Sequence, residues 1–178
     1  YILNGISTDH ECVNLEEARE KAELGMKIII REGSAARNFD ALHPIISEYP
    51  NQCMFCSDDS HPDQLLKHSI NQLVRRAVSL GYPVLDVIKI ASLNPVKHYG
   101  LSVGLLQKGD PADFIIVDSI KDFNVIQTVI DGKTVYSNKK VHINSVSALT
   151  PNQFNIKTIT SEALAYNASE KTVQTIVV

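Results

Sequence analysis

The residues best suited to chemistry lie in three short polar clusters, each directly after a run of apolar residues. Carboxylates, imidazoles and a guanidinium stand close together in these clusters. Such groups bind a metal ion, move a proton or hold a polar substrate. The candidates are Asp9, His10, Glu11, Arg31, Glu32, Ser34, Asp58, Asp59 and His61.

A hydrolytic metal site needs carboxylates and neutral imidazoles that converge on one cation and leave a position open for water. Neighbouring side chains on a strand point to opposite faces, so we expect one of Asp58 and Asp59 to be functional and the other structural. Asp59 or Ser60 also precedes Pro62 as an N-cap precedes a helix, and Arg31 with Glu32 could form a surface ion pair. The chain has no H-x-H and no H-E-x-x-H motif. The residues alone therefore leave both a metal site and a set of polar loops open.

The composition argues against several classes of protein. The 178 residues are 44% hydrophobic, enough to bury a core. A net charge of −3 provides no basic field for nucleic acid, and no run of roughly 18 apolar residues predicts a membrane partner. The cysteines, Cys12, Cys53 and Cys56, are odd in number and include one C-x-x-C pair without a second. They favour a reducing cytoplasm over a disulfide framework or a zinc site.

Alternating strand and helix patterns over the first eighty residues would position the three clusters. A short apolar run precedes Asp9, and residues 26–33 and 52–59 are typical of buried strands. We predict helices in the segments 14–25, 34–50 and 62–81, the first with Asn14 as N-cap, Glu17 as its capping-box partner and Gly25 at its end. This order predicts parallel βαβ units, whose chemistry lies at the carboxyl ends of the strands.

The second half of the chain changes character. We predict a helix from Val84 to Ser92 that ends before Asn94-Pro95. Short alternating runs follow, and Asp131-Gly132 between two of them predicts a two-residue hairpin in an antiparallel sheet. The patterning weakens past residue 140 until a closing strand at 172–178. Both ends of the chain lie inside apolar segments and the first residue is not Met, from which we expect a piece of a longer protein.

Several motifs carry a resemblance to a known family. "SLNPVKHYGL" followed by "GLLQKGDPADFIIVD" resembles the C-terminal signature of the amidohydrolase superfamily. "STDHE", "REGSAARN" and "DDSHPD", in this order, are similar to its adenine deaminase branch. The resemblance covers about residues 4–140. It implies an α/β fold, with residues 1–100 as the last part (about strands 6–8) of a TIM-like (β/α)8 barrel, 101–140 as antiparallel strands of a small composite β-sandwich domain, and 141–178 as a linker and the start of a C-terminal domain.

The resemblance also implies roles for single residues. His10 and Asp58 would be ligands of a divalent metal, manganese or iron, and Asp58 would also shuttle the proton. Glu11 would contact the substrate, and Arg31 and Ser34 would line the pocket. The family's H-x-H pair, bridging carboxylate and further histidine have no counterpart in this chain. They would lie in a missing N-terminal half.

The implied reaction is the hydrolytic deamination of adenine to hypoxanthine and ammonia in purine salvage, by a cytoplasmic and homo-oligomeric enzyme. The piece itself would be inactive alone. Two alternatives stay open: another amidohydrolase that acts on a cyclic amide, like a dihydroorotase or hydantoinase, and a non-catalytic folding or assembly module. The presence of Glu11 and of "DSHPD" ranks the cyclic-amide hydrolase second.

Overall fold

The computed structural model describes residues 1–67, 69–147 and 152–165. The chain divides into two units, Tyr1–Ile143 and Asn144–Val178. In the described part of the second unit, a single 3-10 turn covers Glu162–Leu164. The closing strand predicted at 172–178 lies outside the described residues. All other elements belong to the first unit.

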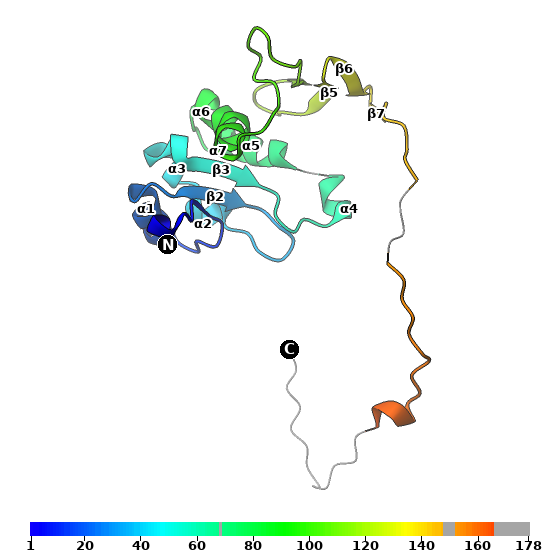
Figure 1. The fold of residues 1–178 in the computed structure, drawn as a ribbon. Coiled ribbons are helices and arrows are strands. Elements are labelled where there is room, and N and C mark those ends of the chain that lie inside the picture. The colour runs from blue at the N-terminus through cyan, green and yellow to red at the C-terminus, as the bar shows by residue number, and fades with distance from the viewer. Residues whose placement is uncertain (68, 148–151, 166–178) are drawn as a thin grey trace. The chain divides into compact units, whose positions relative to one another are not determined.

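Three parallel strands form the first sheet (Figure 1). Their order is β1 (Thr8–Asp9), β2 (Lys27–Arg31) and β3 (Cys53–Cys56). Both pairings are parallel, which confirms the prediction of βαβ units. The first strand is shorter than its apolar run indicates: Ile2–Asn4 form a 3-10 turn that ends at Gly5, whose φ of 88° is left-handed. The chain reverses there before it enters the sheet.

Helix α1 (Leu15–Glu23) joins the first two strands as predicted. The side-chain Oδ1 of Asn14 accepts from the backbone N–H of Glu17 at 2.9 Å, and the Glu17 carboxylate accepts from the N–H of Val13 at 3.2 Å. Gly25 follows the helix with a φ of 91°. These local contacts fix both ends of the helix, and this is why the sequence located it well.

The helix predicted within 34–50 is instead two short ones, α2 (Phe39–Leu42) and α3 (Ile45–Glu48). Pro44 separates them because it has no backbone N–H to donate and because its ring would clash with the preceding helical turn. The helix predicted in 62–81 also divides, into α4 (Pro62–Leu65) and α5 (Ile70–Ser79). Leu66, which follows α4, is 90% exposed. An extended Ser69 begins α5 anew.

The predicted break at Asn94-Pro95 is wrong. Helix α6 (Val84–Ile88) continues through a π-helical segment, Lys89–Leu93, into α7 (Asn94–Tyr99). Pro95 lies in the first turn of α7, directly after the π-helical segment. The wider π turn before it relieves the clash between the proline ring and the preceding turn.

The hydrophobic core lies between the parallel sheet and its helices. Ile28 and Ile30 of β2 are fully buried in it, together with Phe39 and Leu42 of α2 and Val74 of α5. The intervening β2 side chains are only partly buried. One face of the sheet is therefore packed by helices, and the other carries the strand residues that contribute to the cluster described below.

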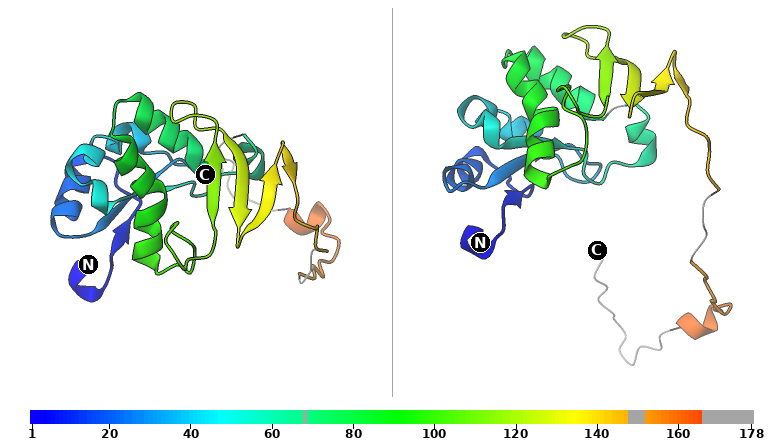
Figure 2. Two further views of the ribbon diagram at one scale, coloured as in Figure 1. Left: turned by 90° about the horizontal axis from the view of Figure 1, so that it is seen from above. Right: turned by 45° about the horizontal axis from the view of Figure 1, so that its top comes forward.

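A second, antiparallel sheet has the order β4 (Phe114–Val117), β5 (Val125–Ile130), β6 (Lys133–Ser137) and β7 (Lys140–Val141), whose strands lie side by side in Figure 2. Asp131 and Gly132 join β5 to β6 with φ values of 50° and 72°, which confirms the two-residue hairpin. Arg75 of α5 donates to the carbonyl of Asp122 and to the side chain of Asn124, and thus contacts the β4–β5 connection.

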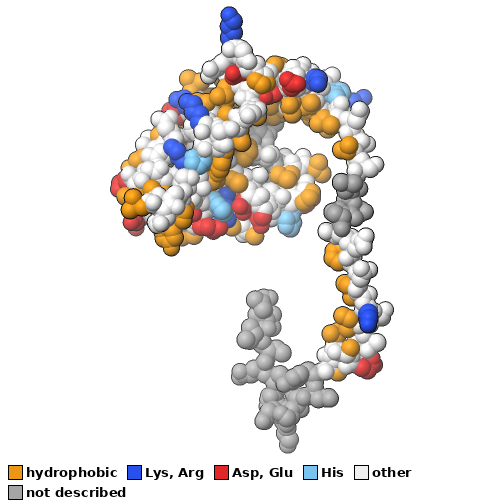
Figure 3. Space-filling model, viewed as in Figure 1, with side chains coloured by type: hydrophobic (Ala, Val, Ile, Leu, Met, Phe, Trp, Pro, Cys, Tyr) orange, Lys and Arg blue, Asp and Glu red, His pale blue; other side chains and the backbone are white. Residues whose placement is uncertain are grey.

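One face of this second sheet leaves large apolar side chains in solvent. Ile126 and Ile130 of β5 are 50% and 51% exposed, and Ile115 of β4 is 48% exposed. Ile115 pairs with Thr128, which is two residues before Ile130, so Ile115 and Ile130 share a face; the pairing register shifts at Ile126. Figure 3 shows hydrophobic side chains at the surface in this part of the chain. Among the described residues, none of the helices combines the length and apolar character that crossing a bilayer requires.

Candidate active site

Three of the predicted clusters meet at the carboxyl ends of the parallel strands. β1 ends at Asp9, just before His10 and Glu11; β2 ends at Arg31; and β3 ends two residues before Asp58. Parallel strands place these ends at one edge of the sheet. The side chains of His10, Glu11, Arg31 and Asp58 lie within contact distance of one another there.

Arg31 is at the centre of this cluster. Its Nη2 donates to Glu11 Oε2 at 2.6 Å and its Nη1 to Glu11 Oε1 at 3.1 Å, a bidentate pair. The same Nη1 lies 3.4 Å from Asp58 Oδ2. The Arg31 side chain is 13% exposed, and its buried Nε has no hydrogen-bond partner within the part of the chain that the structure describes. One guanidinium thus contacts two carboxylates and reduces the repulsion between them.

His10 and Asp58 have the geometry of two ligands of one cation. His10 Nε2 lies 3.9 Å from Asp58 Oδ1 and 3.1 Å from Glu11 Oε1. Metal–ligand bonds of about 2.0–2.2 Å to nitrogen and oxygen allow one ion to bind two donors at the first of these separations. An imidazole nitrogen and a carboxylate oxygen are also suitable donors for such an ion. The residues present therefore fit a divalent metal as part of its ligand set.

Asp58 has an unusual backbone. Its φ of 46° lies in the left-handed region, which residues with a side chain seldom adopt. Its N–H donates to Cys56 Sγ at 3.0 Å across the turn after β3. Non-glycine residues in this conformation cluster at functional sites, where the surrounding structure pays for the strain. The turn directs the Asp58 side chain toward Arg31.

Asp59 contacts a different part of the chain. Its carboxylate accepts from the backbone N–H groups of Ser34 and Ala35, at 2.8 Å and 3.3 Å. A Cβ on Gly33 would lie 2.1 Å from Asp59 Oδ1, so only glycine permits this approach. The prediction that Asp59 or Ser60 caps the following helix is wrong: His61 is at the N-cap position and makes no side-chain cap bond.

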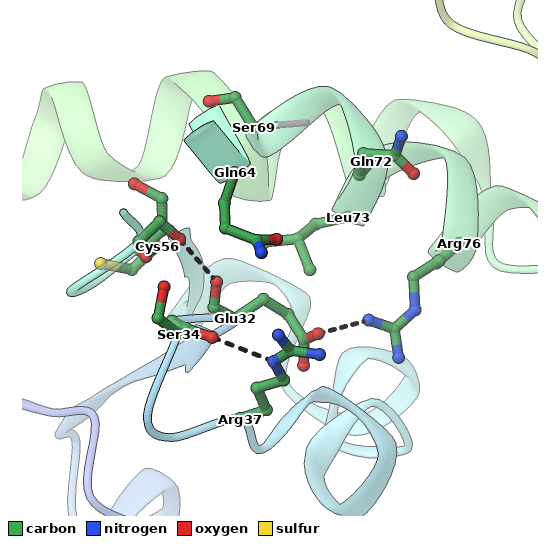
Figure 4. A pocket seen from close by; sticks show the side chains of 12 residues that line it. Glu32, Ser34, Arg37, Cys56, Gln64, Ser69, Gln72, Leu73 and Arg76 are labelled. Atoms are coloured by element: carbon green, nitrogen blue, oxygen red, sulfur yellow. Dashed lines mark hydrogen bonds and ion pairs between the residues drawn. The ribbon is translucent and has the colours of Figure 1, made fainter. Parts of the chain in front are cut away.

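Ser34 does not join the cluster around Arg31. Its Oγ accepts from the backbone N–H of His61 at 2.9 Å. Ser34 instead borders a cavity of about 360 Å³, which Figure 4 shows together with Glu32, Arg37 and Arg76. Glu32 accepts from Arg76 at 2.8 Å, so the surface ion pair expected between Arg31 and Glu32 does not form. Strand alternation sends Arg31 and Glu32 to different partners.

A charged network that the sequence reasoning missed lies behind His10. The ammonium of Lys21 contacts Asp9 Oδ2 and lies 2.6 Å from Glu17 Oε1. Asp9 Oδ1 accepts from the N–H of Glu11 at 2.7 Å. Burial alone would raise the pKa of Asp9, but these hydrogen bonds lower it to about 2. Asp9, Cys12 and Glu17 could by spacing hold a metal, yet the ammonium of Lys21 already bridges the two carboxylates.

The cysteines and His43 have structural surroundings. Burial raises the pKa of both the Cys12 and Cys53 thiols to about 12, and all three cysteines are free. His43 Nδ1 pairs with the hydroxyl of Tyr82 at 2.8 Å. Cys12, Cys53 and His43 have no side-chain contact with the cluster around Arg31 among the described residues, whereas Cys56 Sγ accepts from the N–H of Asp58. Asn38, which the sequence did not single out, does contact this cluster: it is buried and forms hydrogen bonds with the backbone of His10 and Arg31.

The model of the amidohydrolase family matches residues 3–135, well over half of the chain. The chain belongs to the amidohydrolase family. Among curated proteins it is similar to adenine deaminases: it is 60% identical to that of Sulfurovum sp. over 86% of this chain, 57% to that of Methanosarcina mazei over 87%, and 49% to that of Parabacteroides distasonis over 99%. It spans only 29%, 28% and 32% of their respective lengths.

Among solved structures the amidohydrolase chain resembles a beta-aspartyl dipeptidase of Fervidobacterium islandicum AW-1. The TM-score is 0.60 at 22% identity, over 74% of this chain and 37% of that one. The same enzyme in complex with a beta-Asp-Leu dipeptide has a TM-score of 0.58 at 18% identity, over 75% of this chain and 39% of that one. At this identity the likeness concerns the fold alone. Together with the family match it fits a TIM-barrel-like hydrolase, with the parallel sheet and the antiparallel sheet both present.

Proposed function

We propose that these residues form the closing part of a metal-dependent adenine deaminase, which hydrolyses adenine to hypoxanthine and ammonia. The observation that carries the proposal is the convergence of His10, Glu11, Arg31 and Asp58 at the carboxyl ends of β1–β3, in a chain 60% identical to an adenine deaminase. Below, "full-length enzyme" means the longer protein to which we propose the chain belongs.

In this proposal β1, β2 and β3 are about strands 6–8 of the (β/α)8 barrel within residues 1–100. Residues 101–140 belong to the small β-sandwich, and residues 141–178 link to a C-terminal domain. The half-exposed isoleucines of the antiparallel sheet support the second assignment, because a sandwich would cover such a face with a further sheet. The remaining barrel strands and metal ligands would come from an N-terminal half of the same enzyme.

His10 and Asp58 would hold the metal, for which manganese and iron are our candidates. When bound, the ion supplies Lewis-acid activation of the attacking water. Asp58 would accept a proton from that water and deliver it to the departing amino group. Arg31 Nη1 lies 3.4 Å from Asp58 Oδ2 and so helps to orient this carboxylate.

Glu11 would recognise the purine. Its side chain is 66% exposed and therefore accessible to a substrate, while the bidentate pair with the mostly buried Arg31 fixes its orientation. A carboxyl group so placed forms a hydrogen bond with a ring nitrogen and stabilises the charge that develops on the ring. Arg31 acts in this scheme by orienting Glu11 and Asp58. For Ser34 a pocket-lining role stays a prediction, because its hydroxyl contacts the N–H of His61.

We further propose that the enzyme serves purine salvage in the cytoplasm as a homo-oligomer. The free cysteines support a reducing compartment. The relatives' name supports the substrate.

The test is a turnover assay with the full-length enzyme purified and loaded with manganese or with ferrous iron. We expect release of ammonia from adenine and no ring opening of dihydroorotate or hydantoin, which is followed separately as loss of the cyclic substrate. Cleavage of a cyclic amide without action on adenine would replace the proposal by its runner-up. The 178-residue chain alone, with adenine and manganese, should release no ammonia above background, because His10 and Asp58 cannot hold a catalytic ion by themselves.

A further inference from the structure

Asn38 is the one polar residue among the buried side chains of the described chain, with 7% of its surface exposed. It stands at the N-cap position of α2, where an asparagine side chain normally accepts a hydrogen bond from the first turn. Here it makes no such bond. The N–H of Phe39 instead lies 3.4 Å from Glu32 Oε1. The Asn38 side chain is thus available for contacts outside its own helix.

Those contacts join two parts of the candidate active site. Asn38 Nδ2 donates to the backbone carbonyls of His10 and Cys12, each at 3.2 Å. Asn38 Oδ1 accepts from the backbone N–H of Arg31 at 2.8 Å. The backbone N–H of Asn38 also donates to the carbonyl of Arg31 at 3.1 Å. One amide therefore links the loop after β1 to the end of β2.

The consequence is geometric. The linked loop carries the His10 and Glu11 side chains, and the linked strand end carries the Arg31 side chain. The ion pair between Glu11 and Arg31 is partly exposed to solvent, so it constrains the backbone only weakly. Buried and fully hydrogen-bonded polar groups, by contrast, strongly favour a single arrangement. The spacing between these functional groups follows from the buried amide more than from the exposed pair.

We propose that Asn38 is a positioning residue of the deaminase site: its side-chain amide sets the position of the His10–Glu11 loop against Arg31. The expected change in kcat rests on the proposed function, whereas the expected change in the position of the His10–Glu11 loop does not. Misplacing reacting groups by about 1 Å can cost roughly 100-fold in rate. Changing groups that orient metal ligands typically costs about 10–100-fold in affinity or activity.

The chain offers a matched control in Asn94. Its Nδ2 also donates to two backbone carbonyls, those of Pro50 and Cys53, both at 2.8 Å. These carbonyls lie at the amino end of β3, away from the cluster. Asn94→Asp and Asn38→Asp therefore remove the same pair of donated bonds and add the same charge. Asn38→Asp keeps the acceptor for the N–H of Arg31, so the hydrogen bonds that are lost are those to the loop, and the added charge faces the same two carbonyls.

The experiment compares both variants in the full-length enzyme by adenine kinetics, thermal unfolding and amide hydrogen exchange. We expect Asn38→Asp to lower kcat by about 10–100-fold, with a smaller change in KM. Exchange at residues 10–13 should become faster. Asn94→Asp should lower the thermal midpoint as well but leave kcat and the exchange at residues 10–13 near wild type. If Asn38→Asp does not fold, Asn38→Ser, which keeps a hydroxyl donor for one carbonyl, replaces it with a smaller expected loss of kcat.

The outcomes separate this inference from the proposed function. Equal kcat in the two variants, or unchanged exchange at residues 10–13 after loss of the Asn38 amide, would overturn the positioning role. A wild-type enzyme that does not deaminate adenine would overturn the proposed function instead. In that case the role of Asn38 is decided by the Asn38 variant itself. Faster hydrogen exchange at residues 10–13 together with weaker retention of manganese would support the positioning role, and unchanged exchange and retention would contradict it.

Discussion

The two ends of the parallel strands use the same kind of link for different purposes. At the carboxyl end, Asn38 joins backbone that carries the His10, Glu11 and Arg31 side chains. At the amino end, Asn94 joins Pro50 to Cys53, and no charged cluster stands on that backbone in the part of the chain described. Similar hydrogen bonds thus stabilise the fold at one end and, in our proposal, set catalytic geometry at the other.

The two ends also differ in charge. The carboxyl end holds two linked networks, one around Arg31 and one around Lys21. Each places a cation between two carboxylates. At the amino end, within the described residues, the ammonium of Lys27 donates to a carbonyl, that of Asn51 at 3.3 Å. Concentrated carboxylates repel one another unless cations lie between them, so a site that needs acids also needs Arg31 and Lys21.

The largest difference between the ends should come from Asp58. Asp58→Asn removes a proposed metal ligand and the proposed proton carrier, while the amide can keep the size of the side chain. We expect kcat for adenine to fall by about 10²–10⁴-fold, the usual contribution of general acid–base catalysis. Asp86→Asn in α6, which breaks only a pair with Lys89, is the control. Near-normal turnover of Asp58→Asn would remove Asp58 from the mechanism.

A smaller but more specific effect is expected at Glu11. Glu11→Gln should reduce turnover of adenine by about 10–100-fold, because it weakens both the proposed contact with the purine and the pair with Arg31. Manganese content, measured on the same samples, should stay close to that of wild type. If Glu11→Gln instead loses manganese in proportion to its loss of turnover, Glu11 is a metal ligand and not a contact of the purine.

The smallest expected effect is on stability, at Asp9. Its pKa is about 2 in the folded chain against 3.8 for the free group, so the folded state favours the ionised form. The contribution, about 2 kcal/mol, is present above pH 4 and is lost as the pH falls toward 2. Between pH 5 and pH 2 the thermal midpoint should therefore fall more steeply with decreasing pH in wild type than in Asp9→Asn.

A matched control for that titration is the exposed pair between Glu48 and Arg19. Glu48→Gln should leave the slope of the thermal midpoint against pH almost unchanged, since solvent screens an exposed pair. Equal slopes in wild type and Asp9→Asn would show that Lys21 does not stabilise the Asp9 carboxylate as the geometry indicates.

Predictions from the sequence succeeded where contacts are local. The ends of α1 follow from Asn14 and Gly25, and the turn between β5 and β6 follows from Asp131-Gly132. Predictions failed where a helix boundary depends on the packing around it. A periodic pattern continued across Pro44 and past Leu66 although the helices stop there. A π-helical segment likewise carries the chain past Asn94-Pro95, which no short motif announces.

The sequence by itself determined which residue types follow each strand, and with them the family and the candidate residues His10, Glu11, Arg31 and Asp58. Only the tertiary structure decided how these residues pair. It separated Asp58 from Asp59, joined Arg31 to Glu11 instead of Glu32, and placed Asn38 beneath the cluster. The reason is physical: side-chain periodicity is local, whereas each of these contacts joins residues 20 or more positions apart in the chain.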